Sequence, residues 1–173
     1  MDFEILETLA LEQGRLRHLE RHLARMAASC AHFAYPWDEA RVRACLAGVA
    51  AAHGRGLWRV RLLLDAEGAP RAEAFALQPT VTPVRLRLAD RPLAQAHGEW
   101  VRHKTTRRAH YAAFAPAVGS GWFDTVLYNE AGEITETTLA TWPCGSMGAG
   151  SRRRSPAACC PAWAGAWRWS RAC

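Results

Sequence analysis

Residues 101–108 read Val-Arg-His-Lys-Thr-Thr-Arg-Arg, and Lys104 within them is the only lysine in the chain. The other 21 residues in the Lys and Arg total of 22 are all arginine. An arginine stays protonated and serves for surface charge or phosphate contacts, whereas a lysine amine can act as a nucleophile or form a Schiff base. Lys104 is therefore the first candidate catalytic residue, although a GC-rich coding sequence that favours arginine could also leave a single lysine by chance.

The residues before Lys104 predict a small domain of strands and helices. Residues 3–11 alternate as a strand does, and apolar residues recur every three or four positions over 16–33, the period of an amphipathic helix. Asp38 can cap a second helix with an apolar face of its own. Three further strands are expected at 57–64, 71–77 and 84–88, with Arg85 and Arg87 pointing outward from the last.

After an expected linker at 90–98, the pattern predicts a helix, a strand, a turn and a strand. Residues 105–117 have helical spacing, 123–129 resemble a strand, and 130–133 form a tight turn before 134–140. This order places Lys104 and Glu136 on neighbouring elements. We expect a mixed α/β (α+β) fold, with a small domain at 1–89, the linker at 90–98 and the start of a second domain at 99–140.

Composition narrows the class of partner and the compartment. Within residues 1–140, 17 Lys and Arg stand against 16 Asp and Glu, so the net charge of +6 comes from five arginines nearer the C-terminus. This balance is not typical of a nucleic-acid-binding protein. There is no run of about 18 apolar residues, so we expect a cytoplasmic protein without membrane contact. His18 and His22 are expected on a solvated helix face rather than at a metal.

Residues 141–173 differ in composition from the rest of the chain. They hold four of the eight Trp and four of the six Cys, but no Ile, Leu, Val, Phe or Tyr and no acidic residue. Without branched apolar residues they cannot show the periodicity that packs an element on a core, so we expect a disordered tail. One base deleted near codon 141 would explain this composition as a shifted reading frame. An Arg- and Trp-rich tail that binds nucleic acid is the alternative.

Three segments resemble the class IV pyridoxal-phosphate enzymes, which include branched-chain and D-amino-acid aminotransferases and 4-amino-4-deoxychorismate lyase. They are residues 3–9 with 18–26, the run His-Lys-Thr-Thr-Arg-Arg at 103–108, and Asn-Glu-Ala-Gly-Glu-Ile-Thr-Glu at 129–136. They occur in the family's order and at its spacing. The resemblance implies a small N-terminal α/β domain followed by the beginning of a larger domain that binds pyridoxal 5'-phosphate (PLP).

The resemblance also implies roles for three residues. Lys104 would bond to the cofactor aldehyde and move protons at the substrate carbon. Glu136 would face the pyridine nitrogen and keep it protonated, and Arg25 would contact the cofactor phosphate. Read without the resemblance, Arg25 could be ordinary helix surface and Glu136 a solvated strand end.

Within the family, the run at 103–108 looks most like the lyases that release pyruvate from 4-amino-4-deoxychorismate and give 4-aminobenzoate for folate synthesis. Transamination of an amino acid is the alternative, and a truncated remnant without activity is another. An intact member would be a homodimer acting on a small-molecule substrate. Family members carry a Leu-Pro-Gly-Val/Ile turn that holds the cofactor phosphate at a helix N-terminus. Because the tail lacks it, we expect this chain to bind PLP weakly and to have little activity.

Overall fold

The computed structural model describes residues 2–78, 80, 83–94 and 96–139. The described chain forms two compact units. The first unit combines the chain up to residue 79 with residues 103–107, and the second unit contains the remainder. The tail predicted at 141–173 lies outside the described residues, and the domain boundaries expected from the sequence remain predictions.

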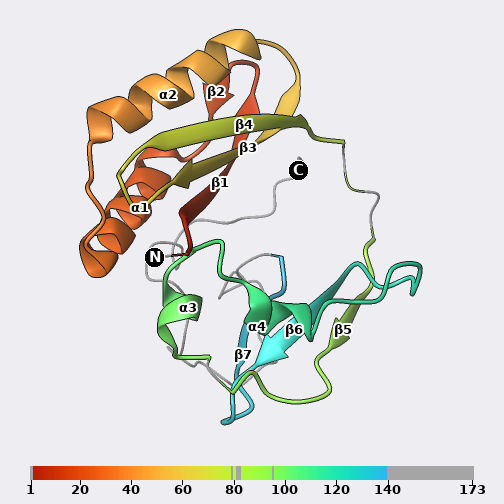
Figure 1. Ribbon diagram of the computed structural model, residues 1–173. Helices are drawn as coiled ribbons and strands as arrows, with labels where there is room; N and C mark the ends of the chain where they lie inside the picture. Colours follow the sequence, from red (N-terminus) through yellow and green to blue (C-terminus); the bar gives the residue numbers. More distant parts are fainter. Residues whose placement is uncertain (1, 79, 81–82, 95, 140–173) are drawn as a thin grey trace, which may run out of the picture. The chain divides into compact units, whose positions relative to one another are not determined.

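The first unit is a four-stranded antiparallel sheet with helices against it (Figure 1). Its strands are β1 (Ile5–Glu12), β2 (Arg15–Leu16), β3 (Leu57–Leu64) and β4 (Pro70–Ala76). They lie side by side in the order β2-β1-β3-β4. Helix α1 (Leu19–Phe33) packs on β1, and α2 (Glu39–Ala52) packs on β4. The core lies between sheet and helices and includes Ile5, Leu9, Val60, Leu62, Met26 and Leu46.

The sequence predicted most of this unit. The strands at 3–11, 57–64 and 71–77 are confirmed, and Asp38 caps α2 by accepting a hydrogen bond from the Arg41 amide at 3.0 Å. The expected helix start at residue 16 is wrong, because Leu16 belongs to β2. Gln13 and Gly14 have φ of 49° and 75° and form the turn of a hairpin between β1 and β2. Because the chain makes this hairpin first, the helix begins at Leu19.

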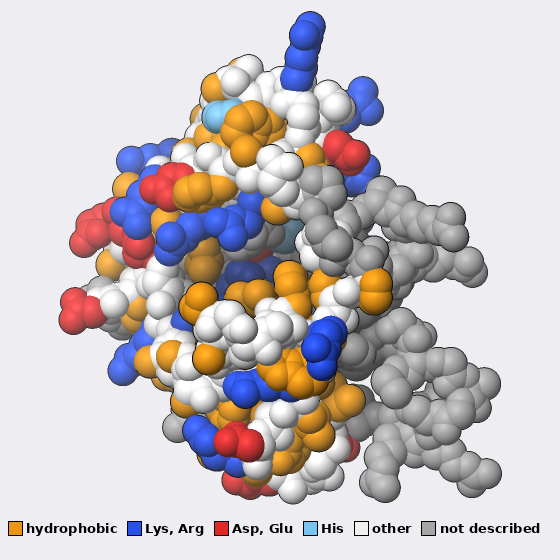
Figure 2. Space-filling view, turned by 90° about the vertical axis from the view of Figure 1, so that its right-hand side faces the viewer, with side chains coloured by type: hydrophobic (Ala, Val, Ile, Leu, Met, Phe, Trp, Pro, Cys, Tyr) orange, Lys and Arg blue, Asp and Glu red, His pale blue; other side chains and the backbone are white. Residues whose placement is uncertain are grey.

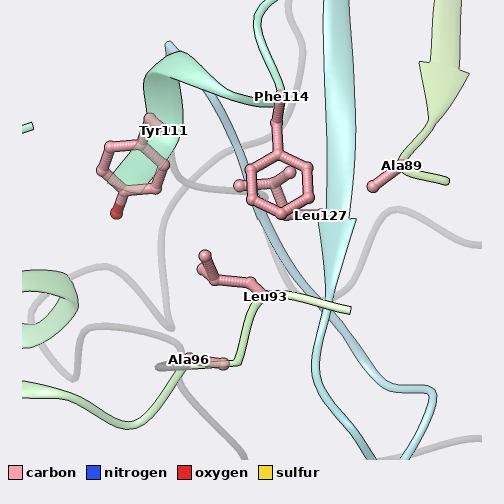
Figure 3. Close-up of a cluster of buried hydrophobic side chains, with 6 residues drawn as sticks. All are labelled: Ala89, Leu93, Ala96, Tyr111, Phe114 and Leu127. Carbon is pink, nitrogen blue, oxygen red and sulfur yellow. The ribbon is translucent and has the colours of Figure 1, made fainter. Parts of the chain in front are cut away.

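The second unit is built on a three-stranded sheet in the order β5-β6-β7. Its strands are β5 (Leu86–Leu88), β6 (Asp124–Tyr128) and β7 (Ile134–Thr137), and its short helices are α3 (Glu99–Arg102) and α4 (Ala109–Ala112). Strand β6 runs parallel to β5 and antiparallel to β7. The buried cluster drawn in Figure 3 contains Ala89, Leu93, Ala96, Tyr111, Phe114 and Leu127. Leu93 and Ala96 come from the stretch expected to be a linker.

Two predictions for the second half are wrong. The helix expected over 105–117 is only the single turn α4, because Thr105 forms an antiparallel bridge with Ile5 instead of entering a helix. Arg87 does not point outward: its Nε donates to Thr125 Oγ1 at 2.9 Å and its Nη2 to the Phe114 carbonyl at 3.1 Å. These bonds give Arg87 a structural role inside the second unit.

Charged side chains of both signs lie on the described surface (Figure 2). Figure 2 shows Lys and Arg side chains spread among acidic and hydrophobic ones on the face in view. Within the described residues, no helix combines the length and apolar character needed to cross a membrane.

Candidate active site

Lys104 is held in the first unit by its backbone. The Leu6 amide donates to the Lys104 carbonyl at 2.9 Å, and the Thr106 amide donates to the Glu4 carbonyl at the same distance. The Thr106 hydroxyl also accepts from the Glu4 amide at 2.9 Å. Residues 104–106 therefore run alongside the start of β1, although about a hundred positions separate the two segments. These hydrogen bonds fix the position of the Lys104 backbone.

His103 anchors the other side of Lys104 to α1. Its Nδ1 lies 3.0 Å from the Ser29 hydroxyl oxygen, and its ring stacks on His32 with centroids 4.1 Å apart. Phe33 meets the same ring edge-on at 5.2 Å. The candidate lysine is thus flanked by a residue packed on a helix and by residues paired with a strand.

Arg25 lies on α1 and binds Glu7 of β1 side-on. Its Nε donates to Glu7 Oε1 and its Nη2 to Oε2, both at 2.5 Å, and His22 Nδ1 lies 2.7 Å from Oε2. The Glu7 side chain is 1% exposed and that of Arg25 11%. Burial alone would raise the pKa of Glu7, but hydrogen bonds from His22 and Arg25 and their charges hold it below its usual value. Glu7 is therefore an ionised acceptor at neutral pH.

The sequence reasoning missed Glu7 and misplaced His22. His22 is buried, not on a solvated face, and His18 is the N-cap residue of α1 with φ of 53°. Glu7 alternates with Ile5 and Leu9 on the apolar face of β1, so a carboxylate there needed a buried partner. That position was the signal available in the sequence.

Glu136 lies on β7 in the second unit and is fixed by α4. Its Oε2 accepts from the Tyr111 hydroxyl at 2.9 Å. Burial raises the pKa of Tyr111, and the charge of Glu136 raises it further, so the phenol remains a donor. The Arg108 guanidinium lies 4.6 Å from the centre of the Tyr111 ring and donates to the Thr138 carbonyl at 2.7 Å. Tyr111 and Arg108 together fix the face of α4 that meets β7.

A buried carboxylate also joins the start of β6 to the end of β7. Asp124 accepts hydrogen bonds from the amides of Thr125 at 2.7 Å, Thr138 at 3.2 Å and Leu139 at 3.1 Å, and from the Thr138 hydroxyl. Asp124 is 2% exposed. These bonds fix the strand that carries Glu136 from its C-terminal end.

Of the three residues implied by the resemblance, the structure brings two onto one scaffold. Lys104 and Arg25 both belong to the first unit, where they contact consecutive β1 residues, Leu6 and Glu7. Glu136 belongs to the second unit. Its position next to Lys104 therefore remains a prediction, as do the roles of all three residues.

Comparison with known families identifies the family of the chain. The family model for class IV amino-transferases matches residues 4–142, most of the chain. The chain belongs to the class IV aminotransferase family. This is a family of PLP-dependent enzymes, so the class and the mixed α/β fold expected from the sequence are confirmed.

Solved structures agree with the family. A proposed amino-acid aminotransferase from Mesorhizobium loti is 33% identical with a TM-score of 0.70, and the match covers 79% of this chain and 67% of that protein. The 4-amino-4-deoxychorismate lyase from Pseudomonas aeruginosa is 27% identical with a TM-score of 0.61, over 79% of this chain and 56% of the lyase. The chain thus spans little more than half of the lyase. No protein of curated function matches it.

A third structure supports the fold alone. A hypothetical aminotransferase from Mycobacterium tuberculosis, solved in a PLP-bound form, is 22% identical with a TM-score of 0.64, over 78% of this chain and 55% of that protein. By chemical type, the residues expected from the sequence suit PLP: the first unit offers the amine of Lys104 and the guanidinium of Arg25, and the second unit offers the Glu136 carboxylate, which accepts from a protonated tyrosine. An aldehyde, a phosphate and a ring nitrogen are the groups that an amine, a guanidinium and a carboxylate are suited to bind, and these roles remain predictions for the three residues.

Proposed function

We propose that this class IV family chain binds PLP through Lys104, Arg25 and Glu136, and that the reaction is pyruvate elimination from 4-amino-4-deoxychorismate. The observation that carries the proposal is the pairing of the Lys104 segment with β1, beside the strand residue that holds Arg25. Those contacts attach the Lys104 segment and the Arg25 side chain to the same strand. The run at 103–108 and the likeness to the Pseudomonas lyase support the lyase reaction.

Each residue has a chemical task in this proposal. Bound PLP supplies an aldehyde for the amine and a ring that accepts electrons from the reacting carbon. Lys104 binds that aldehyde and later carries a proton to or from the substrate carbon. Glu136 holds the proton on the ring nitrogen, and Arg25 binds the phosphate.

Transamination of an amino acid is the second candidate. The 33% identity to the Mesorhizobium protein favours it. Both reactions would use Lys104 and PLP, so only their products distinguish them. The lyase releases pyruvate and 4-aminobenzoate, whereas the transaminase gives a keto acid and a second amino acid. We further propose a cytoplasmic homodimer that acts on small molecules and binds no nucleic acid.

The test is PLP titration of the purified chain followed by its visible absorbance, with Lys104→Ala and Lys104→Arg as variants. A band in the wild type that both variants lose supports Lys104 as the PLP-bonding residue, since neither variant has an amine at this position. A band that survives Lys104→Ala would reject it. Incubation at saturating PLP with 4-amino-4-deoxychorismate or with an amino acid and a keto acid then separates lyase from transaminase by product.

The reading frame of the tail needs its own test. Resequencing the gene across codons 135–175 would reveal a missing base near codon 141. A restored frame that begins Asn-Val-Ala-Val would support a full-length enzyme with the same three residues. If the sequence stands, we expect weak PLP binding, because residues 141–173 lack the Leu-Pro-Gly-Val/Ile turn that holds the cofactor phosphate in the family.

A further inference from the structure

The buried carboxylate of Glu7 has no task in the proposed reaction, although it contacts one of its residues. We infer that Glu7, supported by His22, is a positioning residue that sets the direction of the Arg25 guanidinium toward the cofactor phosphate. The inference rests on the proposed function, because it assigns a role within the same PLP site.

The geometry of the Glu7–Arg25 pair determines where the guanidinium points. Both Glu7 oxygens are used, one by Nε and one by Nη2, each at 2.5 Å. Two parallel bonds fix the plane of a guanidinium as well as its distance. The direction of Nη1 is then fixed, because the three nitrogens are coplanar. Arg25 thus presents its third nitrogen in one orientation only.

His22 restrains the carboxylate in turn. Its Nδ1 lies 2.7 Å from Oε2, the oxygen that also accepts from Arg25 Nη2. His22 and Arg25 are three positions apart on α1, so both face β1 from one side of the helix. Glu7 is therefore fixed by two donors on one helix and cannot rotate without breaking a bond to a buried residue.

Stability alone does not explain an ionised group at this position. Ile5 and Leu9, its neighbours on the same face of β1, are each 1% exposed and apolar. Replacing a buried ion pair by apolar residues of similar size is often neutral or stabilising, whereas removing one partner is costly. A Glu–His–Arg set in an otherwise apolar layer is better explained by a need to hold the guanidinium.

The charge of Glu7 and its positioning role predict opposite changes in phosphate affinity when Glu7 is neutralised. A carboxylate beside Arg25 lowers the net positive charge that a phosphate would meet, so charge alone predicts tighter phosphate binding once Glu7 is neutral. Positioning predicts weaker binding. The two effects act in opposite directions on one measured affinity.

The experiment compares PLP with pyridoxal, which has the aldehyde but no phosphate, by visible absorbance titration of the full chain. In Glu7→Gln we expect PLP affinity to fall by about tenfold or more, the cost of losing a charge-assisted bond, with pyridoxal affinity unchanged. Glu12→Gln is the matched control, because Glu12 lies on the same strand but is 48% exposed and paired with Arg17. It should leave both affinities as in the wild type.

Each of the other outcomes would overturn the inference, and one of them would overturn the proposed function as well. Unchanged or tighter PLP binding in a folded Glu7→Gln chain would overturn the inference and leave the proposed function standing. An equal loss for PLP and pyridoxal would also overturn it, since that loss is structural. A wild type that gives no band with either compound would overturn the proposed function and the inference with it. If circular dichroism shows Glu7→Gln unfolded, Glu7→Asp keeps the charge but shortens the reach and takes its place.

Discussion

Tyr111 donates its hydroxyl hydrogen to Oε2 of Glu136 at 2.9 Å, joining a helix of one turn to the last described strand. Figure 3 draws Tyr111 as one of the residues of the buried cluster of the second unit. The phenol is 6% exposed as a residue, so water is a poor substitute for either partner. The orientation of Glu136 therefore depends on α4, although α4 is too short to be stable alone.

Removing this donor should weaken catalysis without unfolding the chain. In Tyr111→Phe we expect the rate at saturating PLP to fall by about tenfold or more, because Glu136, a charged acceptor, loses the hydrogen bond that the phenol donates. Tyr128→Phe, in the neighbouring strand β6, is the control and should retain the rate. Equal rates for the two variants would show that the hydroxyl of Tyr111 does not support Glu136.

Asp124 should contribute strongly to the stability of the second unit. Oδ1 of Asp124 accepts from the Thr125 and Thr138 amides and Oδ2 from the Leu139 amide, so in Asp124→Asn the NH2 group faces at least one amide donor in either orientation, and we expect a loss of about 2–3 kcal/mol in the free energy of unfolding. Asp90→Asn is the control because Asp90 is 77% exposed, and its effect should stay within about 0.5 kcal/mol. Urea unfolding of both variants measures the difference. Similar midpoints would contradict this role for Asp124.

Gly68 should tolerate no side chain, for two separable reasons. Its φ is +76°, and a Cβ would lie 2.8 Å from the Pro36 carbonyl oxygen and 2.9 Å from the Pro36 Cβ. Gly132 has φ of +77° but open space around it. Gly132→Ala should therefore show only the conformational cost, about 1–2 kcal/mol, and Gly68→Ala a larger one. Thermal melts compare the two, and equal losses would mean that the Pro36 contact relaxes freely.

Glu7 should make the first unit sensitive to acid. Its pKa is lowered in the folded chain from 4.5, so it binds a proton less readily there than in the unfolded chain. The stability it contributes is present above pH 4.5 and lost as the pH falls below that value through the folded pKa. Unfolding free energies measured from pH 7 downward should show this loss in the wild type but not in a folded Glu7→Gln chain. Parallel curves would contradict it.

The sequence predicted elements wherever one period dominated. The alternation of β1 and the spacing of α1 gave their type and nearly their bounds, and Lys104 was singled out as the only lysine in the chain. The sequence prediction failed at 105–117, where the helical spacing of the residues competed with the pairing of Thr105 with Ile5. The bridge between Ile5 and Thr105 joins positions a hundred apart, and no local pattern contains that information.

The supporting residues were harder to predict for the same reason. Glu7 looked like an ordinary charge until His22 and Arg25 were seen to meet it from α1. Arg87 resembled a surface residue, but its partners Thr125 and Phe114 follow much later in the chain. For Arg87 the alternation along the strand is the same whether the side chain faces water or a buried partner, so only tertiary structure distinguishes the two.

The pairing of residues 104–106 with the start of β1 makes the first unit discontinuous along the chain. During synthesis, the sheet and its two helices can assemble as soon as residue 79 has emerged, but the strand segment beside β1 is still missing. It arrives only after 23 residues of the second unit have been made. The segment that carries Lys104 is therefore the last part of the first unit to be synthesised.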